Sequence, residues 1–486
     1  MKNNIYQAKN PSLMMDLYEL TMANGYFLQE NKDVCVAFDV FYRKNPDGGG
    51  FSVFAGLEQI VEYLEGIHFT AEEIDYLRSL HQFSEEFLAY LSSFRFTGDL
   101  YAFPEGTIMY PNEPIMTIVA PLVEAQIIET EILAQINHQS LIATKARRIV
   151  KAADGRPVSD FGARRAHNND AAIYGARAAY IGGVNGTATV CAGQYFDIPV
   201  GGTMAHSWVM FYKDELTAFQ KFADIYPDNC ILLVDTYDVL HSGMPNAIKI
   251  FQGMKEKGIQ SKNYGIRIDS GDLAYLTMEA RKMLDEAGFT DAKIIISNSL
   301  DEFTITSILN QGGCVSSFGV GERLITSRSE PVFGAVYKLC AVEEDGKMEA
   351  RIKVSETPEK ITNPGLKDVY RIFDETGHAI ADLIASKGEE VDLSRPFRYI
   401  DTARPWKNRS FENCTARLLQ KLVLSGGKRT EELPATKEIA AYVKHQLENE
   451  IWDTEQRFQN PHVHYLDMTP DYYQMKMDLL HEEGKA

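Results

Sequence analysis

Short β-branched runs alternate with segments of helical apolar spacing through the middle of the chain. Between residues 155 and 321 there are six such runs, several of which end in a polar residue or a glycine. Alternation of strands and helices is typical of a mainly parallel sheet, so this part predicts an α/β fold. Six strand-helix units favour an irregular βα barrel over an open sheet. The expected helices span 168–180, 214–225, 245–257, 272–287 and 301–311.

The residues before this region follow a different pattern. Residues 34–120 mix short β-rich runs with Gly and Pro, and residues 57–64 show helical spacing, so we expect an α+β domain here. From residue 122 the apolar spacing is helical up to Asp154-Gly155, which supplies a stop signal. This pattern predicts one long helix that joins two domains.

Beyond residue 338 the pattern returns to hairpins, with turn signals at Asp345-Gly346 and Thr376-Gly377, and then to a helix at 436–448. This segment either returns to the first domain or forms a third one. The expected division is an α+β domain over 1–140, a βα barrel packed against it over 141–338, and a C-terminal segment over 339–486.

Charge and composition narrow the class of protein. The chain has 486 residues, of which 45% are hydrophobic, and a formal net charge of -19. Nucleic acids and anionic membranes reward a basic surface, so we expect neither as a partner. An anionic ligand must therefore be bound by local groups.

Cysteine usage and the N-terminus indicate the compartment. The six cysteines lie far apart without a CxxC pair, which argues against a zinc ribbon and a disulfide scaffold. The N-terminus has no continuous apolar stretch, and no uncharged run of about 18 apolar residues occurs. We therefore expect a soluble protein that stays in the reducing cytoplasm.

Carboxylates and small polar residues follow several of the predicted strands. An aspartate after a strand has two interpretations, as a helix N-cap or as part of an acidic rim that binds Mg²⁺, sugar hydroxyls or a cationic sugar centre. Reactive residues of a barrel gather where its strands end. The residues expected at that edge are Asp160, Asp235, Asp269, Ser297 and Gly319, with Asp272 close behind.

Arginines and glycines near the same strand ends suit an anionic ligand. Arg164 and Arg165 follow one strand, and Arg267 lies in another. Glycine at a strand-to-helix turn, as at Gly319 and Gly321, lets backbone N–H groups reach a phosphate. Arginine binds carboxylate or phosphate through two hydrogen bonds. The pattern indicates a site for phosphate or carboxylate groups.

Two aromatic residues are candidates for ligand contacts. Tyr18 lies in "DLYELTMANGY", and Phe161 follows the first strand of the predicted barrel. Most such rings belong to a core, but a flat heteroaromatic ligand needs a ring to stack on. Both interpretations stay open for these residues.

One histidine follows a glycine turn in the stretch "FDIPVGGTMAHSWVM". His206 has the spacing of an ordinary packed histidine, with Trp208, Val209 and Met210 as packing partners. The turn that ends in Thr203 supplies backbone donors to an oxyanion or a phosphate near the imidazole. His206 is then a candidate base, acid or phosphoryl acceptor, and spacing does not choose among these roles.

Taken together, the motifs resemble one known family, the nicotinate phosphoribosyltransferases. The resemblance runs over nearly the whole chain and depends on the combination, because each motif alone is weak. The segments that carry it are "DLYELTMANGY", "FDVFYRKNP", "EGTIMYPNEPIM", "DFGARRAH", "GGTMAHSWV", "LLVDTYD", "GIRIDSGDL", "SNSLDE", "FGVGERLIT", "GAVYKL" and "EKITNPGLKDVYRI".

The resemblance implies a type II phosphoribosyltransferase fold and a homodimer with shared active sites. Tyr18 of the N-terminal segment would then contact nicotinate across the interface. The implied reaction joins nicotinate to 5-phosphoribosyl-1-pyrophosphate, giving nicotinate mononucleotide and pyrophosphate. It is a ligase-type reaction of NAD salvage that is coupled to ATP hydrolysis.

The resemblance also implies residue roles. His206, in the family's GTxAHS motif, would be a phosphohistidine that forms from ATP and is hydrolysed during turnover. Asp235 and Asp269 would bind the ribose and Mg²⁺, Arg267 the nicotinate carboxylate, and Phe161 would stack on the pyridine. The other implied substrate contacts are Arg164 and Arg165 with phosphates or the nicotinate carboxylate, Gly319 and Gly321 with the 5-phosphate, and Thr203 and Ser297.

Two positions depart from the patterns of related proteins. Ala188 stands where nicotinamide-using relatives place an acid, which favours nicotinate because an acid would repel its carboxylate. Glu322 stands where many members place threonine, so we expect no direct phosphate contact from its side chain.

Three other functions stay open from the sequence. A nicotinamide or quinolinate phosphoribosyltransferase is the nearest alternative. A phosphate-binding aldolase or isomerase would need a lysine at a strand end, and we find no convincing one. A non-catalytic metabolite-binding barrel is the alternative from another class.

Overall fold

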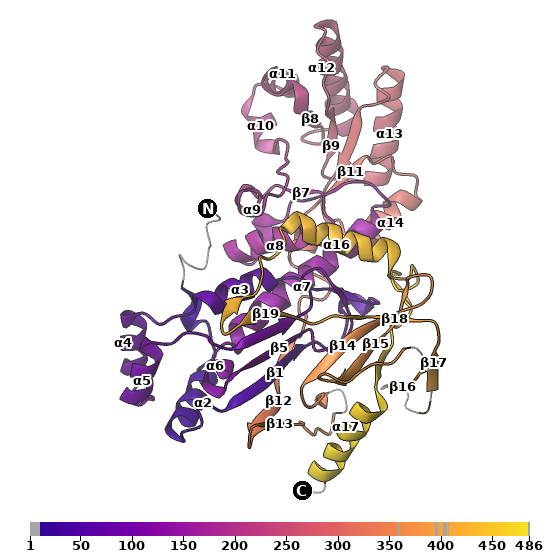
Figure 1. Ribbon diagram of the computed structural model, residues 1–486. Helices are drawn as coiled ribbons and strands as arrows, with labels where there is room; N and C mark the ends of the chain where they lie inside the picture. The colour runs from indigo at the N-terminus through magenta and orange to yellow at the C-terminus, as the bar shows by residue number, and fades with distance from the viewer. Residues whose placement is uncertain (1–9, 358–359, 394–396, 402–405, 407, 485–486) are drawn as a thin grey trace. The chain divides into compact units, whose positions relative to one another are not determined.

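Two compact units make up the fold (Figure 1). The computed structural model describes residues 10–357, 360–393, 397–401, 406 and 408–484. Unit 1 comprises Met1–Leu141 and Val332–Ala486, and unit 2 comprises Ile142–Pro331. Unit 1 is therefore built from both ends of the chain.

A six-stranded parallel sheet forms the centre of unit 2, in the order β7-β6-β11-β10-β9-β8. The sheet curls into a half-barrel, and β7 and β8 are its two edges. The predicted α/β class is confirmed, although hydrogen bonding does not close the sheet into a ring. The strands are β6 Val158–Asp160, β7 Gly186–Thr187, β8 Cys230–Leu233, β9 Tyr264–Ile268, β10 Lys293–Ile296 and β11 Ser317–Val320.

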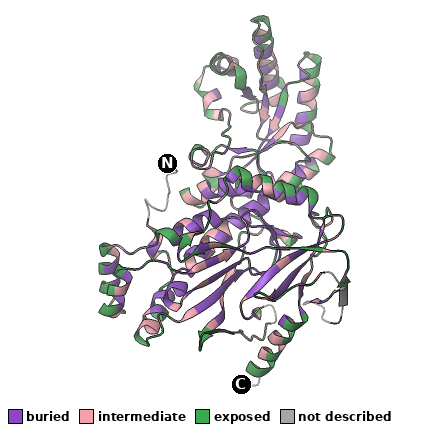
Figure 2. Cartoon of the chain, viewed as in Figure 1, coloured by how far each residue is buried: buried purple, intermediate pink, exposed green. Residues whose placement is uncertain are grey.

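Helices follow the strands of unit 2, bury one face and expose the other (Figure 2). The five helices expected from the apolar spacing are present to within one residue at each end. Asn and Asp side chains cap four of them by accepting a backbone N–H of the first turn. The helices are α8 Asn169–Ile181, α9 Val190–Phe196, α10 His206–Phe211, α11 Glu215–Ile225, α12 Met244–Glu256, α13 Leu273–Glu286, α14 Glu302–Asn310 and α15 Glu322–Ile325.

The long helix predicted from residue 122 is two helices. α6 spans Leu122–Gln126 and α7 spans Glu129–Ala152. Ile127 and Ile128 lie between them and are completely buried. The chain makes a turn at these two residues, so the apolar spacing continues across a break between two helices.

One seven-stranded and one six-stranded sheet organise unit 1. The first has the order β13-β12-β1-β5-β3-β19-β20 and the second β17-β16-β21-β15-β14-β18, while β2 and β4 form a separate pair. C-terminal strands complete the first sheet, since β12 pairs with β1 and β19 pairs with β3, both antiparallel. The N-terminal strands are β1 Cys35–Phe41, β2 Ser52–Val53, β3 Asp99–Ala102, β4 Ile108–Met109 and β5 Met116–Pro121. The C-terminal strands are β12 Val336–Glu344, β13 Lys347–Ala350, β14 Lys367–Phe373, β15 Ala379–Ser386, β16 Phe397–Asp401, β17 Asn408–Phe411, β18 Thr415–Leu418, β19 Lys421–Ser425, β20 Lys428–Arg429 and β21 Leu466–Met468.

The remaining helices of unit 1 lie in both parts of the chain. They are α2 Leu17–Leu28, α3 Leu57–Gly66, α4 Ala71–Ser79, α5 Glu85–Ser92, α16 Thr436–Asn449 and α17 Pro470–Glu483. Within the described residues, no helix combines the length and apolarity that crossing a membrane requires.

A buried ion cluster ties α7 to α14 within unit 2. The Glu302 side chain is fully buried, and its Oε1 accepts hydrogen bonds from Lys145 Nζ at 2.9 Å and from Arg148 Nε at 2.8 Å. Lys145 and Arg148 are themselves buried. Removing one member of such a cluster leaves charge uncompensated in a medium of low polarity.

We predict that Glu302→Ala lowers the free energy of unfolding by about 3–5 kcal/mol, because two buried cations lose their counter-charge. Glu286→Ala is the matched control, since this glutamate is exposed on α13. Urea denaturation of both variants measures the difference. A loss of stability in Glu302→Ala no greater than in the control would contradict the role given to the cluster.

Candidate active site

Polar residues gather where the strands of the half-barrel end. The five strands β6, β11, β10, β9 and β8 are neighbours and run parallel, so their carboxyl ends share one edge. Asp235 follows β8, Asp269 follows β9 and Ser297 follows β10. The structure thus brings together three of the residues that the sequence placed at this edge.

Asp235 accepts two hydrogen bonds from the loop after β9. Its Oδ2 accepts from the Asp269 backbone N–H at 3.0 Å and from Ser270 Oγ at 2.6 Å. Its Oδ1 is buried and has no hydrogen-bond partner among the described residues. A buried carboxylate oxygen without a donor is costly, so this atom is the best-placed acceptor for a cation or a ligand hydroxyl.

Asp269 and Ser297 form the centre of the cluster. The Ser297 hydroxyl donates to Asp269 Oδ1 and also accepts from Arg267 Nε, at 3.2 Å. Arg267 Nη2 lies 3.9 Å from Asp269 Oδ2. Ser297 is therefore held between a cation and an anion, and it fixes the direction of both.

Arg267 is largely buried at the end of β9 and leaves few donors unused. Its side chain is 13% exposed, and Nη1 donates to Thr203 Oγ1 at 2.7 Å and to the Met204 carbonyl at 3.3 Å. Burial lowers the pKa of this guanidinium, while Asp269 and Asp235 oppose that effect. The acidic edge and Arg267 therefore stabilise each other's charge.

His206 opens α10 with its imidazole between two of these groups. Nδ1 lies 3.1 Å from Thr236 Oγ1, and Nε2 lies 3.9 Å from Asp269 Oδ2. The side chain is 40% exposed, so the ring is anchored on one edge and accessible to a ligand. It is not the fully packed histidine that spacing alone allowed.

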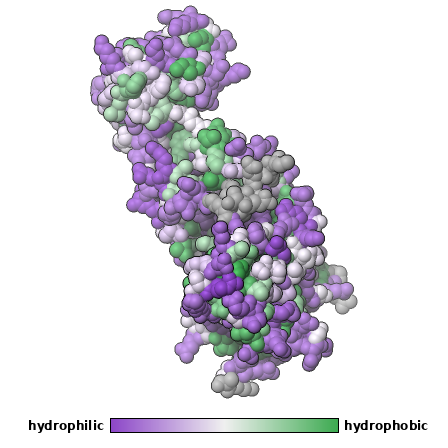
Figure 3. All heavy atoms as spheres, turned by 90° about the vertical axis from the view of Figure 1, so that its left-hand side faces the viewer, coloured by the Kyte–Doolittle hydropathy of each residue, from purple (hydrophilic) through white to green (hydrophobic). Residues whose placement is uncertain are grey.

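The residues after His206 divide between core and surface. Trp208 Nε1 donates to the Ala218 carbonyl at 3.0 Å, and Val209 is completely buried. Met210 is 65% exposed, so the expectation that it packs beside the imidazole is wrong, because α10 turns that position toward solvent. Figure 3 shows hydrophobic side chains among hydrophilic ones on the surface of the α10 and α11 region.

Phe161 lies over Arg267, and Gly319 makes room for its ring. The ring centroid is 5.8 Å from Arg267 Cζ, within reach of a cation–π contact. A Cβ atom on Gly319 would meet the Phe161 ring at 2.4 Å. The glycine in β11 is therefore required for the position of this ring, whatever else it contacts.

The predicted phosphate-binding residues lie beyond β6 and β11. Arg164 and Arg165 are exposed in the short 3₁₀ helix η3 Ala163–Arg165, and neither forms an ion pair with another described residue. Gly321 directly precedes α15. Glu322, the first residue of α15, directs its carboxylate to Arg328 Nη1 at 3.0 Å.

Two of the aspartates have structural roles. Asp160 is completely buried, and its oxygens accept from the Gly162 N–H and Thr187 Oγ1, both at 2.8 Å. Burial raises the pKa of Asp160. Asp272 caps α13 by accepting from the Tyr275 N–H at 3.1 Å. Asp160 is the last residue of β6, as expected, but both of its oxygens are bonded within the chain, where it holds β6 and β7 together.

Tyr18 belongs to unit 1 and lies on α2. Its side chain is 44% exposed, and burial together with the neighbouring Glu129 raises the pKa of its hydroxyl. Met14, Leu17 and Met22 are also exposed in this segment. The structure thus leaves Tyr18 on an accessible apolar surface of its own unit.

The acidic edge has the oxygen ligands that Mg²⁺ prefers. Asp235 offers the unpartnered Oδ1, and Mg²⁺ needs one or two carboxylates when phosphate oxygens and water complete its shell. The described part of the chain has no group of three or more His, Cys, Asp or Glu arranged to hold a metal by themselves. The unpartnered Asp235 Oδ1 is the feature of this edge that suits a cation.

Sequence reasoning missed Thr236 and Ser270, which hold His206 and Asp235. Each directly follows one of the singled-out aspartates, in "VDTYD" and "IDSGD". A hydroxyl beside a strand-end carboxylate was the available signal. The role of such a hydroxyl depends on which loop lies opposite it in the fold, and residue spacing does not give that information.

Three family models match successive parts of the chain. The nicotinate phosphoribosyltransferase (NAPRTase) N-terminal domain matches residues 13–137, the NAPRTase family 157–363, and the NAPRTase C-terminal domain 366–476. Together these matches cover far more than half of the chain.

Curated relatives and a solved structure are similar along almost the full length. The chain is 46% identical over 472 residues to a nicotinate phosphoribosyltransferase of Bacillus subtilis (strain 168), covering 97% of this chain and 95% of that protein. It is 33% identical over 525 residues to one of Dictyostelium discoideum, covering 96% and 87%. The crystal structure of human nicotinic acid phosphoribosyltransferase shares the fold, with a TM-score of 0.83, 24% identity and coverage of 96% and 99%.

We predict that Gly319→Ala lowers the free energy of unfolding by about 1–3 kcal/mol, because the added methyl collides with the Phe161 ring. Gly201→Ala is the control, since a Cβ there meets no atom within 4 Å. Thermal unfolding of both variants compares the two sites. Equal melting temperatures would show that the ring does not need this glycine.

Proposed function

The chain belongs to the nicotinate phosphoribosyltransferase family, and we propose that it couples phosphoribosyl transfer onto nicotinate to ATP hydrolysis through a phosphorylated His206. The products are nicotinate mononucleotide and pyrophosphate, in the salvage of NAD. The observation that carries the proposal is an exposed imidazole anchored by Thr236 beside Asp269 at the strand-end cluster.

Phosphorylation of His206 is a balanced transfer. The unprotonated ring nitrogen attacks the γ-phosphorus of ATP, an N–P bond forms, and the bond to the leaving ADP oxygen breaks. Water later cleaves the N–P bond and releases inorganic phosphate. A phosphoryl group carries almost two negative charges, so it changes the affinity of the neighbouring site for pyrophosphate. ATP energy then drives the condensation through differential binding.

Asp235 and Asp269 would hold Mg²⁺, which when bound neutralises charge on the pyrophosphate of the sugar substrate. The same two carboxylates would have a second role, in stabilising the transition state. Displacement at the ribose carbon develops positive charge on the ring, and preorganised anions stabilise such charge. Ser270 and Ser297 keep both carboxylates oriented while the leaving group departs.

Phe161 and Arg267 supply contacts for a pyridine carboxylate. The aromatic face suits stacking on the pyridine ring. Arg267 Nη2 donates no hydrogen bond to a described residue and lies 3.9 Å from Asp269 Oδ2, so it is the donor best placed for the carboxylate of nicotinate.

Arg164, Arg165 and the backbone at Gly321 would bind phosphate groups. The two arginines have no competing ion pair in the described residues. Glu322 is neutralised by Arg328, which supports the expectation that its side chain makes no phosphate contact. The 5-phosphate is then held by N–H groups at the turn before α15.

A homodimer would complete the site. Tyr18 and the exposed apolar residues around it on unit 1 need a partner surface, and Met210 and Phe211 on α10 of unit 2 are 65% and 81% exposed. Association of these surfaces would bring Tyr18 to a partner's nicotinate site. Exposed apolar patches of this kind are typical of interaction surfaces.

The nicotinamide and quinolinate reactions remain the nearest alternatives. Ala188, at the end of β7, leaves an exposed position without charge. We predict that the purified protein converts nicotinate and leaves nicotinamide and quinolinate unconverted. Ala188→Asp should reduce the preference for nicotinate over nicotinamide at least about tenfold, because like charges repel. Ala188→Asn is the control for size.

Conversion of nicotinamide or quinolinate in place of nicotinate by the wild-type protein would overturn the assignment of substrate. Product formation is followed by chromatography of labelled pyridines. A protein that converts none of the three would favour the non-catalytic barrel.

We predict that incubation with γ-labelled ATP gives a protein-bound label that is stable in base and labile in acid. His206→Asn should abolish it. His241→Asn should keep it, since this histidine is 85% exposed and paired with Asp238. Label retained in His206→Asn at the wild-type level would remove His206 from the proposed role.

A further inference from the structure

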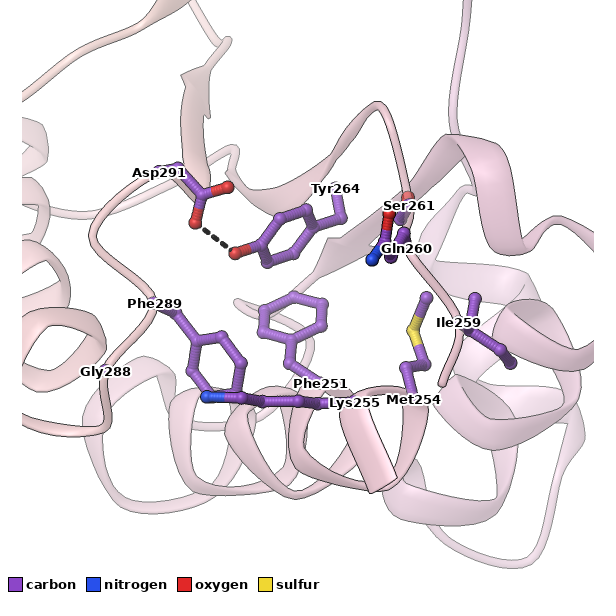
Figure 4. A pocket seen from close by; sticks show the side chains of 10 residues that line it. All are labelled: Phe251, Met254, Lys255, Ile259, Gln260, Ser261, Tyr264, Gly288, Phe289 and Asp291. Carbon is purple, nitrogen blue, oxygen red and sulfur yellow. Dashed lines mark hydrogen bonds between the residues drawn. The ribbon is translucent and has the colours of Figure 1, made fainter. Parts of the chain in front are cut away.

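A pocket of 340 Å³ lies at the other end of the parallel strands of unit 2 (Figure 4). Its walls come from the last turns of α12, the loop from α12 to β9, the first residue of β9 and the loop from α13 to β10. None of the strand-end residues described above lines it. The lining residues are Phe251, Met254, Lys255, Ile259, Gln260, Ser261, Tyr264, Gly288, Phe289 and Asp291.

Three aromatic rings form the apolar wall of this pocket. Phe251 lies edge-on to Tyr264 with ring centroids 5.1 Å apart, and Phe289 lies 5.7 Å from Phe251. The Tyr264 hydroxyl donates to the Asp291 carboxylate, as the dashed line in Figure 4 marks. That bond holds the tyrosine ring beside Phe251 and Phe289.

Two polar groups at the pocket are available to a ligand, one of them the buried hydroxyl of Ser261 and the other the exposed ammonium of Lys255. The Ser261 hydroxyl is buried and has no hydrogen bond to any described residue. Lys255 has its ammonium 5.9 Å from the Phe289 ring centroid and forms no ion pair within the described parts of the chain. Buried hydroxyls are normally hydrogen-bonded, and a lone one calls for an explanation.

The lining defines the chemistry of a fitting ligand. The aromatic wall with Met254 and Ile259 suits a planar ring. Lys255 suits an anionic group on that ring, and Ser261 suits a polar atom at its edge. The volume is at the low end of the roughly 300–1,000 Å³ typical of ligand pockets, which fits one ring system with a single side group.

We propose that this pocket is a second ligand site, separate from the strand-end site, for a planar aromatic ring that carries one carboxylate or phosphate group. Strand β9 connects the two sites, since Tyr264 lines the pocket and Arg267 lies three residues further along the same strand. The proposal concerns binding and does not depend on the reaction assigned to the strand-end site.

Methyl NMR of the full chain, labelled at the Met methyl groups, tests both sites in one spectrum. Met254 lines the pocket, whereas the Met204 carbonyl contacts Arg267 at the strand-end site. Met254→Leu and Met204→Leu assign the two signals. Benzoate and phenyl phosphate are the probes, so the two arms separate a carboxylate ligand from a phosphate ligand.

We expect at least one probe at about 1 mM to shift the Met254 signal through the ring current of the bound aromatic. Lys255→Glu should weaken that binding about tenfold, because an attractive charge becomes a repulsive one. Lys249→Glu, the same change at an exposed lysine on the same helix, should leave the affinity within about twofold.

Two results would overturn the proposal. Either the Met254 signal stays unmoved by both probes, whether or not the Met204 signal moves, or Lys255→Glu binds as tightly as Lys249→Glu. Unchanged signals of the other methionines verify that each variant is folded. Since no turnover is measured, failure of this site and failure of the phosphohistidine are distinguished.

Discussion

The positive charge of Arg267, buried at the end of β9, is the constraint around which the candidate active site is arranged. A largely buried guanidinium is stable only where acceptors and counter-charge surround it. Thr203 and the Met204 carbonyl bind one side, Ser297 another, and Asp269 compensates the charge. The loop before α10 is thereby fixed to β9, and His206 begins the helix that follows.

The polar groups of the half-barrel divide into those that hold the backbone and those that remain available. Asp160 and Asp272 accept hydrogen bonds from neighbouring backbone N–H groups, and Asp160 also accepts one from a threonine hydroxyl. Asp235 keeps one buried oxygen without a donor, and His206 keeps one edge open. Asp160 and Asp272 preserve the spacing of the strand ends. The side chains of Asp235 and His206 are therefore preorganised for a ligand.

The two ends of the parallel strands offer different environments. The carboxyl ends carry paired charges and hydroxyls, the groups that bind polar and charged ligands at this edge of parallel sheets. The amino ends near β9 carry an aromatic wall with one lysine and one hydroxyl that has no partner among the described residues. The polar site and the aromatic site therefore lie at opposite ends of the short strand β9, Tyr264–Ile268.

Sequence periodicity by itself determined the α/β class of unit 2, its five main helices and the position of Asp235, Asp269 and Ser297 at strand ends, because apolar period and turn residues act locally. The family match along the chain likewise follows from sequence alone. Tertiary structure decided what periodicity does not encode: the break between α6 and α7, the burial of Asp160, the exposure of Met210 and the contact of Thr236 with His206. Each of these depends on which distant segment lies opposite, and an isolated stretch of sequence carries no record of its neighbours in space.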